Sequence, residues 1–215
     1  MPISRTLRPE MQYATLAQQG DTAQLGMWVV IATETVFFGA LIFTYFIYRY
    51  AYPKEFAYAA QETVLWCGTL NIGLLLTSSL TMVLAIEAAV AGKRRAFKNW
   101  LRATAFLGIA FVCVKGYEWY LDYQDQVEPT LNFILKPHQA PPAEPFWVFY
   151  FVATPLHALH LLIGIGLIFY MLWLVRRGDL SPGYHAPLEV VGLYWSFVDT
   201  VWIFLYPAIY LVGRS

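Results

Sequence analysis

The stretch Phe151–Tyr170 reads FVATPLHALHLLIGIGLIFY and contains no Asp, Glu, Lys or Arg. A helix that crosses a bilayer needs about 20 consecutive, mostly apolar residues. This stretch lies inside a longer apolar segment, from about Phe146 to Val175, which therefore predicts a transmembrane helix. Four more segments meet the same criterion, and the five predicted spans are 26–48, 63–91, 101–120, 146–175 and 189–212.

The composition favours the same class of protein. Hydrophobic residues make up 59% of the chain and charged residues 13%, whereas a soluble domain carries about 25% charged residues. The fold class predicted is an all-α membrane protein with one five-helix transmembrane domain, residues 26–213, after a polar tail, residues 1–25. The formal net charge of zero favours no nucleic-acid partner.

The positions of Lys and Arg predict the orientation of the spans. Nine lie in the N-terminal tail, the second connection and the fourth connection, and four lie on the opposite side of the spans. Cytoplasmic loops carry the excess of Lys and Arg. We therefore expect a cytoplasmic tail with the N-terminus inside and the C-terminus outside.

Two acidic residues lie deep within predicted spans, where an ionisable group costs a few kcal/mol and usually faces protein, a cavity or lipid. Glu34 lies about 12 Å into the first span and Asp199 about 15 Å into the fifth, measured from the same side at 1.5 Å per residue. Apolar residues surround Glu34 in sequence, and a neutral carboxyl costs less in lipid than a charged one. Two interpretations stay open for Glu34: a structural hydrogen bond, or a lipid-facing or proton-linked role.

Asp199 has candidate partners on its own helix. Trp195 and Trp202 share its face at helical spacing, and Ser196 lies one turn before it. The favoured interpretation is a structural acid that is hydrogen-bonded by the flanking indoles and fixes helix packing. A proton-relay acid and a ligand or lipid contact are the alternatives.

Histidines and a polar stripe mark two other spans. His157 and His160 lie at i and i+3, a spacing that suits a metal or haem. The remaining histidines lie in connections, so structural hydrogen bonding is favoured. Lys115 and Glu118 lie on one face at the end of the third span and are expected to pair. That face, which continues through Asp122 and Asp125, predicts a solvated or subunit-facing helix end.

Several motifs together resemble subunit III of the haem–copper oxidases. They are ETVFFGALIF (Glu34–Phe43), LNIGLLLTSSLT (Leu70–Thr81), GYEWY (Gly116–Tyr120), FVATPLHALHLLIGI (Phe151–Ile165) and GLYWSFVDTVWIFLYPAIYLVG (Gly192–Gly213). The resemblance covers nearly the whole chain. Seven-helix mitochondrial members carry two additional N-terminal helices, so this chain resembles the five-helix bacterial form.

The resemblance implies a multi-pass subunit of a bacterial plasma membrane oxidase, with no haem, copper or active site of its own. Haem and copper are expected in partner subunits. The chain would pack beside subunit I, with subunit II and other respiratory subunits in the same complex. Family members form a V-shaped bundle with a lipid cleft, so bound phospholipid is expected. They sustain proton uptake by subunit I and protect it during turnover.

The resemblance also assigns residues. Glu34 matches the family's intramembrane glutamate, His157 and His160 its paired histidines, and Asp199 with Trp202 its VDxxW motif. These residues, with Trp195 and Ser196, are expected to form a structural polar network. Ser196 stands where the family usually has histidine, which suggests a divergent branch.

Other functions remain open from the residues alone. The accessory proteins of nitric oxide reductases are one alternative within the resemblance. A small proton-coupled transporter with Glu34 and Asp199 as its relay is another, and a haem-bearing membrane enzyme is a third. The choice between cytochrome c and a quinol as electron donor would lie in other subunits.

Overall fold

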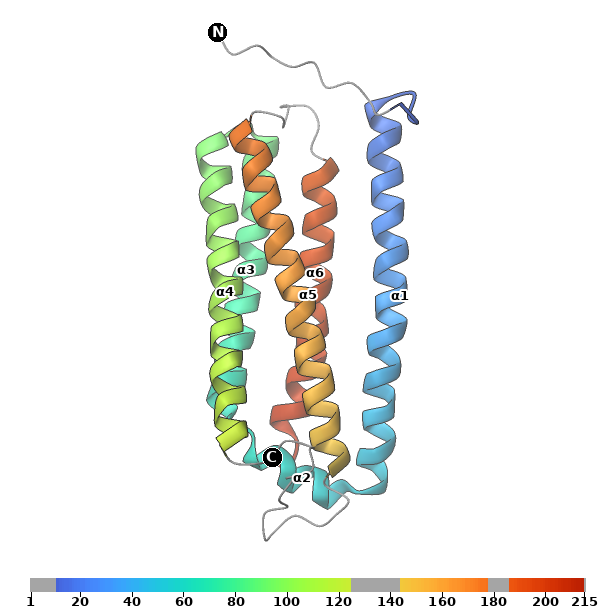
Figure 1. The fold of residues 1–215 in the computed structure, drawn as a ribbon, viewed down its shortest axis with the longest axis vertical. Helices are drawn as coiled ribbons and strands as arrows, with labels where there is room; N and C mark the ends of the chain where they lie inside the picture. Colours follow the sequence, from blue (N-terminus) through green and yellow to red (C-terminus); the bar gives the residue numbers. More distant parts are fainter. Residues whose placement is uncertain (1–10, 125–143, 178–185, 215) are drawn as a thin grey trace.

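The computed structural model describes residues 11–124, 144–177 and 186–214, and every regular element within these ranges is helical. The elements are α1 (Leu16–Ala51), α2 (Pro53–Glu62), α3 (Leu65–Val90), α4 (Arg94–Gln124), α5 (Glu144–Arg177), α6 (Ala186–Tyr206) and the π-helix η2 (Pro207–Leu211). Five helices, namely α1, α3, α4, α5 and α6 with η2, are long and apolar enough to cross a membrane. The predicted all-α, five-span architecture is confirmed (Figure 1).

Some helices extend beyond the apolar segments that predicted them. Helix α1 begins at Leu16, inside the predicted tail, and the Thr15 side chain caps it by accepting a hydrogen bond from the backbone N–H of Gln18. Helix α4 runs from Arg94 to Gln124, past both ends of the predicted span 101–120. A hydropathy window finds only the apolar part of a helix, whereas the hydrogen-bonded helix continues into polar sequence.

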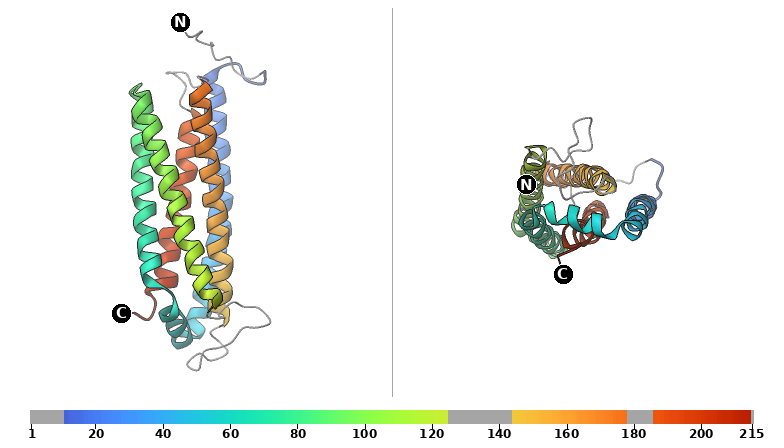
Figure 2. Two further views of the ribbon diagram at one scale, coloured as in Figure 1. Left: turned by 60° about the vertical axis from the view of Figure 1, so that its left-hand side comes forward. Right: turned by 90° about the horizontal axis from the view of Figure 1, so that it is seen from below.

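The short helix α2 was expected to be a connection between spans. Pro53 starts it, a position where the missing N–H of proline costs nothing. Its buried residues Phe56, Ala59 and Ala60 recur at helical spacing and face the bundle. The helix lies across the ends of the long helices (Figure 2). We call this end of the bundle the α2 end.

Helix α6 is the central element and α1 the peripheral one. Helix α6 packs against α1, α3 and α5, and α3 pairs extensively with α4. In the apolar stretch of α6, 56% of residues are buried, against 6% in α1. Helix α1 stands to one side of the other four (Figure 1). Most of its surface therefore faces lipid or another protein.

The indole of Trp195 joins α6 to three neighbouring helices. It packs against Gly108 of α4 and Gly164 of α5, where an added Cβ would lie 2.8 Å and 3.0 Å from ring carbons. Its Nε1 donates a hydrogen bond to Ser78 Oγ of α3 at 3.0 Å. Small residues allow such close approach in membrane bundles. The position of one side chain thus depends on glycines in two other helices.

The π-helix η2 closes the α2 end of α6. Pro207 begins it, and its wider turn directs the Tyr210 ring against Gly68 of α3, where an added Cβ would lie 2.8 Å from three ring carbons. The Tyr45 hydroxyl of α1 donates to the Ala208 carbonyl. The π-helix therefore connects the peripheral helix α1 with α3.

An apolar cavity of about 320 Å³ opens between α1, α2 and α5 near the α2 end. Aliphatic and aromatic side chains form most of its wall, with few polar groups. Its lining residues are Leu41, Thr44, Tyr45, Tyr48, Phe56, Glu144, Pro145, Val148, Phe149 and Val152.

Replacement of Gly108 by alanine tests the packing of Trp195. The new methyl group would overlap the indole, so we expect Gly108→Ala to lower the free energy of unfolding by about 1–3 kcal/mol. Gly116→Ala on the same helix is the matched control, because nothing lies within 4 Å of its Cβ position. Thermal unfolding in detergent micelles measures both. Equal stability of the two variants would contradict this account of the packing.

Candidate functional site

Glu34 and His160 form a polar pair between α1 and α5. Glu34 Oε2 lies 3.2 Å from His160 Nε2, and the side chains are 29% and 15% exposed. The residues near Glu34 in sequence offer it no polar partner. Its partner, His160, comes from helix α5. The edge of the Phe38 ring covers the histidine, with ring centroids 5.3 Å apart. The pair is polar, shielded on the bundle side and accessible from outside the bundle.

The geometry of His160 determines where its hydrogens lie. Nδ1 is 2.7 Å from the Leu156 carbonyl oxygen, which only accepts, so Nδ1 carries a hydrogen. A neutral imidazole then presents a bare Nε2 to the Glu34 carboxyl group. The 3.2 Å contact is an ion pair if the imidazole is protonated and a hydrogen bond if the carboxyl group is protonated. A proton on either group would lie between Nε2 and Oε2.

His157 does not join this pair. Its ring is 1% exposed and stacks on Trp202, with centroids 5.0 Å apart and planes 28° apart. Phe111 contacts the same ring at a centroid distance of 5.5 Å. Although His157 and His160 share a face in sequence, one packs in the core and the other contacts α1. They do not form a shared ligand pair.

Asp199 receives its hydrogen bond from α3, not from the indoles on its own helix. It is 4% exposed and accepts a hydrogen bond from the Ser79 hydroxyl. Trp195 donates to Ser78 instead, and Trp202 Nε1 has no hydrogen-bond partner within the described residues. The expected bonds from the indoles to Asp199 are therefore wrong. The ring planes of both tryptophans are used for packing, which directs their N–H groups away from the carboxylate.

Ser196 also lies outside the expected polar network. Its side chain is exposed on the surface of α6, and its carbonyl accepts a hydrogen bond from Thr200 at 2.7 Å. Residue 196 directly follows the buried Trp195 and so points about 100° away from it on the helix. At this position the chain presents a small hydroxyl group to lipid or to a partner.

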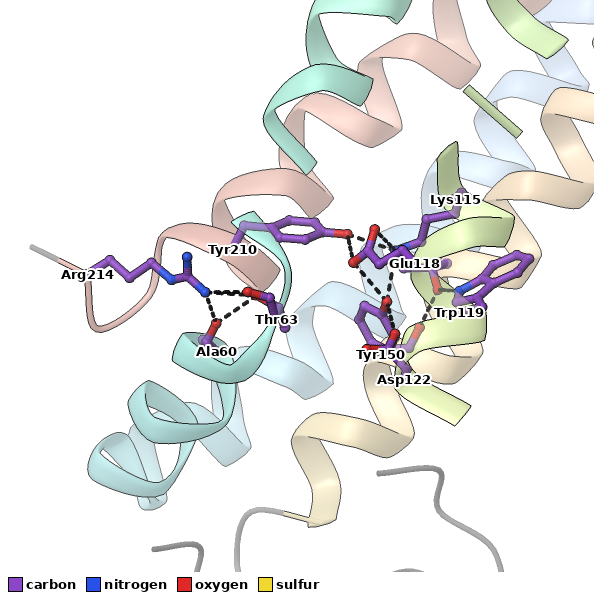
Figure 3. Close-up of polar contacts among 10 residues, drawn as sticks. Ala60, Thr63, Lys115, Glu118, Trp119, Asp122, Tyr150, Tyr210 and Arg214 are labelled. Carbon is purple, nitrogen blue, oxygen red and sulfur yellow. Dashed lines mark hydrogen bonds and ion pairs between the residues drawn. The ribbon is translucent and has the colours of Figure 1, made fainter. Parts of the chain in front are cut away.

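The Lys115 cluster, which consists of Lys115, Glu118, Asp122, Tyr150 and Tyr210, lies in the interior near the α2 end (Figure 3). Lys115 Nζ lies 3.1 Å from Glu118 Oε2 and donates to the hydroxyls of Tyr150 at 3.0 Å and Tyr210 at 2.7 Å. Both tyrosine oxygens contact Glu118 Oε1, at 2.9 Å and 2.7 Å, and Tyr150 Oη lies 2.6 Å from Asp122 Oδ2. Helices α4, α5 and η2 are thus linked by one network.

The expectation of a solvated or subunit-facing stripe on α4 is wrong for the described residues. Lys115 and Glu118 are 0% exposed and Asp122 is 5% exposed. The predicted pairing of Lys115 with Glu118 is present, but Tyr150 and Tyr210 enclose it. Periodicity correctly placed the charges on one face of the helix, but it could not show which element covers that face. Asp125, which continued the stripe, lies outside the described residues.

A second polar contact fixes the same end of the bundle. The Nη2 atom of Arg214 donates to the carbonyl oxygens of Ala60 and Gln61 at 2.9 Å each, and to that of Thr63 (Figure 3). These are carbonyls at the C-terminus of α2, where helical partners run out and a cation is favoured. The guanidinium group therefore attaches the segment after η2 to α2.

Interhelical serine and threonine contacts complete the core of α3. Thr81 Oγ1 and Thr104 Oγ1 lie 2.8 Å apart between α3 and α4, in addition to the bonds made by Ser78 and Ser79. Within residues 11–124, 144–177 and 186–214, no three His, Cys, Asp or Glu side chains lie close enough to hold a metal ion. The arrangement offers buried hydrogen bonding and proton sharing.

Comparisons with known proteins point in one direction. The family described as "Cytochrome c oxidase subunit III" matches residues 142–214, which include all of α5, α6 and η2. Proteins named "Probable quinol oxidase subunit 3" from Staphylococcus aureus and Staphylococcus epidermidis are each 28% identical to this chain. Both alignments cover 91% of this chain and 91% of the relative. The similarity therefore extends over nearly the full length of each protein.

Removal of the Lys115 charge tests the buried cluster. Lys115→Met leaves Glu118 as an uncompensated anion in the core, so we expect a loss of about 3–5 kcal/mol in the free energy of unfolding. Adding Glu118→Met to that variant should recover part of the loss, because the unpaired carboxylate is removed. Thermal unfolding of the single and double variants in detergent measures the coupling. Simple addition of the two single losses would show that the two charges do not interact.

Proposed function

Because the chain belongs to the subunit III family of haem–copper oxidases, we propose that it is the non-catalytic third subunit of a respiratory quinol oxidase in a bacterial plasma membrane. The observation that carries the proposal is the similarity over 91% of both chains to bacterial proteins named as quinol oxidase subunits. Electron transfer and the reduction of oxygen to water belong to partner subunits in this proposal. Subunits I and II are the expected partners, and this chain packs beside subunit I.

The large exposed apolar surface of α1 supports a role in a complex. The side chains of Val36, Phe43 and Tyr50 are 73%, 67% and 91% exposed, along a helix that the rest of the chain hardly covers. In a membrane such a surface contacts lipid or another subunit. The chain therefore uses α1 to extend its contact area in the bilayer, with α6 as the anchor for the bundle.

Bound phospholipid is the second part of the proposal. The cavity between α1, α2 and α5 has an apolar wall and a volume of about 320 Å³, and an acyl chain fits that chemistry. Tyr48 and Glu144 line the same cavity at the α2 end of α1 and α5. An acyl chain held there would stabilise the position of α1, and through α1 the surface offered to subunit I. In the predicted orientation this end faces the outside of the cell.

Glu34 has a proton-linked role in this proposal. Two observations support this role: Glu34 Oε2 lies 3.2 Å from His160 Nε2, and both side chains are partly exposed, so the pair can be reached from the outside of the bundle. A group of this kind can take up and release a proton without disturbing the buried core. We assign to it a supporting role in proton supply and in the persistence of activity, and no role in the oxygen chemistry.

The variant Glu34→Gln tests that role. The amide keeps the size of the side chain and a donor for His160 Nε2, but it does not exchange a proton. We expect nearly unchanged initial oxygen consumption and a shorter active lifetime during sustained turnover. Glu189→Gln is the control, because Glu189 accepts a hydrogen bond from Gln24 at the end of the bundle away from α2 and does not contact His160. An unchanged lifetime with normal assembly would make Glu34 purely structural.

Purification tests the assignment itself. We expect the tagged chain to co-purify with a haem-containing subunit and to contribute no haem band when it is separated from that subunit. Oxygen consumption with a quinol donor identifies the complex, whereas nitric oxide consumption would identify a nitric oxide reductase. Proton-coupled uptake by the chain alone in proteoliposomes would overturn the proposal in favour of a transporter.

A further inference from the structure

Three polar side chains in the core of the bundle have hydrogen-bonding groups that no other described residue satisfies. They are Asn71 of α3, His157 of α5 and Trp202 of α6, and their side chains are 0%, 1% and 0% exposed. The unpaired atoms are Nδ2 and Oδ1 of Asn71, Nδ1 and Nε2 of His157, and Nε1 of Trp202. Buried polar groups in native proteins are almost always hydrogen-bonded, either to protein or to ordered water. These atoms therefore need a partner that residues 11–124, 144–177 and 186–214 do not supply.

Helices α3 and α6 pack against each other in opposite directions. Ser79 of α3 donates a hydrogen bond to Asp199 of α6. Ten residues earlier on α3, the Thr69 hydroxyl lies 2.9 Å from the hydroxyl of Tyr206, which comes seven residues after Asp199 on α6. A step toward the start of α3 is therefore matched by a step toward the end of α6.

This antiparallel packing places Asn71 at the level of Trp202. The Trp195 indole donates to Ser78 Oγ at 3.0 Å. Asn71 lies seven residues before Ser78, and Trp202 lies seven residues after Trp195. Seven residues make almost two helical turns, so each residue shares a face with its counterpart about 10.5 Å away along the helix. The second level thus repeats an amide or hydroxyl opposite an indole, but at this level the indole N–H has no acceptor among the described residues.

His157 joins the same level from α5. Its ring stacks on that of Trp202, with centroids 5.0 Å apart. Phe111 of α4 contacts both rings, at centroid distances of 5.5 Å from His157 and 4.9 Å from Trp202. Helices α3, α5 and α6 therefore contribute hydrogen-bonding atoms to one level of the core, and α4 contributes an apolar ring.

We propose that this level of the core is an internal water site, in which ordered water links Asn71, His157 and Trp202. A buried water molecule typically makes about three hydrogen bonds to polar groups that would otherwise be unsatisfied. Trp202 Nε1 only donates and Asn71 Oδ1 only accepts, so water accepts from the first and donates to the second. A ring nitrogen of His157 is the third partner. No covalent bond changes in this binding.

The surroundings favour water over an ion. The three side chains offer both donors and acceptors, which suits a molecule that also donates and accepts. Lys115 Nζ lies 5.6 Å from the centre of the Trp202 ring, and its charge would repel a cation. Bulk water does not reach the centre of a bilayer, so any water at this level is held by the protein.

A structure of the purified protein, with whatever subunits accompany it, tests the site when its resolution shows ordered water. We expect solvent density within hydrogen-bonding distance of both Trp202 Nε1 and Asn71. The Trp195–Ser78 level is the internal control, because its direct bond leaves no place for water between the two groups. A direct bond between Asn71 and Trp202 would overturn the site. So would the absence of density at this level in a map that shows other buried waters.

Stability measurements give a second test. Asn71→Leu replaces the amide by two methyl groups, and we expect it to remove the density and to lower the melting temperature in detergent. Trp202→Phe should then lower the melting temperature by less in the Asn71→Leu background than in the unmodified protein, because the link through water is already broken. Thr77→Val is the matched control on α3, since the exposed Thr77 hydroxyl bonds only to the Gly73 carbonyl of its own helix. It should leave the effect of Trp202→Phe unchanged.

Equal effects of Trp202→Phe in the unmodified and Asn71→Leu backgrounds would overturn the shared water. If Asn71→Leu does not accumulate, the map of the unmodified protein decides the question alone. Neither measurement depends on the proposed function, since a chain that fails to bind an oxidase would still hold or lack this water.

Discussion

The hydrogen-bonding demand of one buried ammonium group organises the α2 end of this protein. Lys115 is fully enclosed within a membrane-spanning helix, where water does not take its hydrogens. Its acceptors come from α4, α5 and η2, so these three segments must meet around it. The π-helical turn at Pro207 and the small Gly68 make that meeting possible. At this end of the bundle, the positions of α4, α5 and η2 and the hydrogen bonding of Lys115 therefore depend on each other.

The acidic residues within the spans fall into two groups, buried and partly exposed, and the groups suit different roles. Glu118 and Asp199 lie in the core and accept hydrogen bonds from side chains on neighbouring helices. Glu34 lies at the boundary between α1 and α5 and meets a single histidine. A buried acid that is bonded across helices stabilises one arrangement of them, whereas a partly exposed acid can be reached from outside the bundle. The division follows the surroundings of each acid and not its depth in the membrane.

The sequence predicted the five spans and the pairing of Lys115 with Glu118, because apolar length and helical spacing are local properties. It placed the partners of Asp199 on the wrong helix, since spacing shows which residues share a face but not which helix covers it. Ser79, Tyr150 and Tyr210 were missed as partners for the same reason. Helix α2 was missed because it is short and only half apolar. The tyrosines in WVFYF (Trp147–Phe151) and AIYL (Ala208–Leu211) offered a signal only once the helices were placed together.

The position of Trp195 has a consequence for how the protein is made. The helix that carries Trp195 is the last of the described spans in chain order, so a ribosome synthesises it after α3, α4 and α5. Until then Ser78 lacks the hydrogen bond from Trp195, and the space beside Gly108 and Gly164 is not filled by the indole. Closure of the bundle around Trp195 therefore waits for the synthesis of α6.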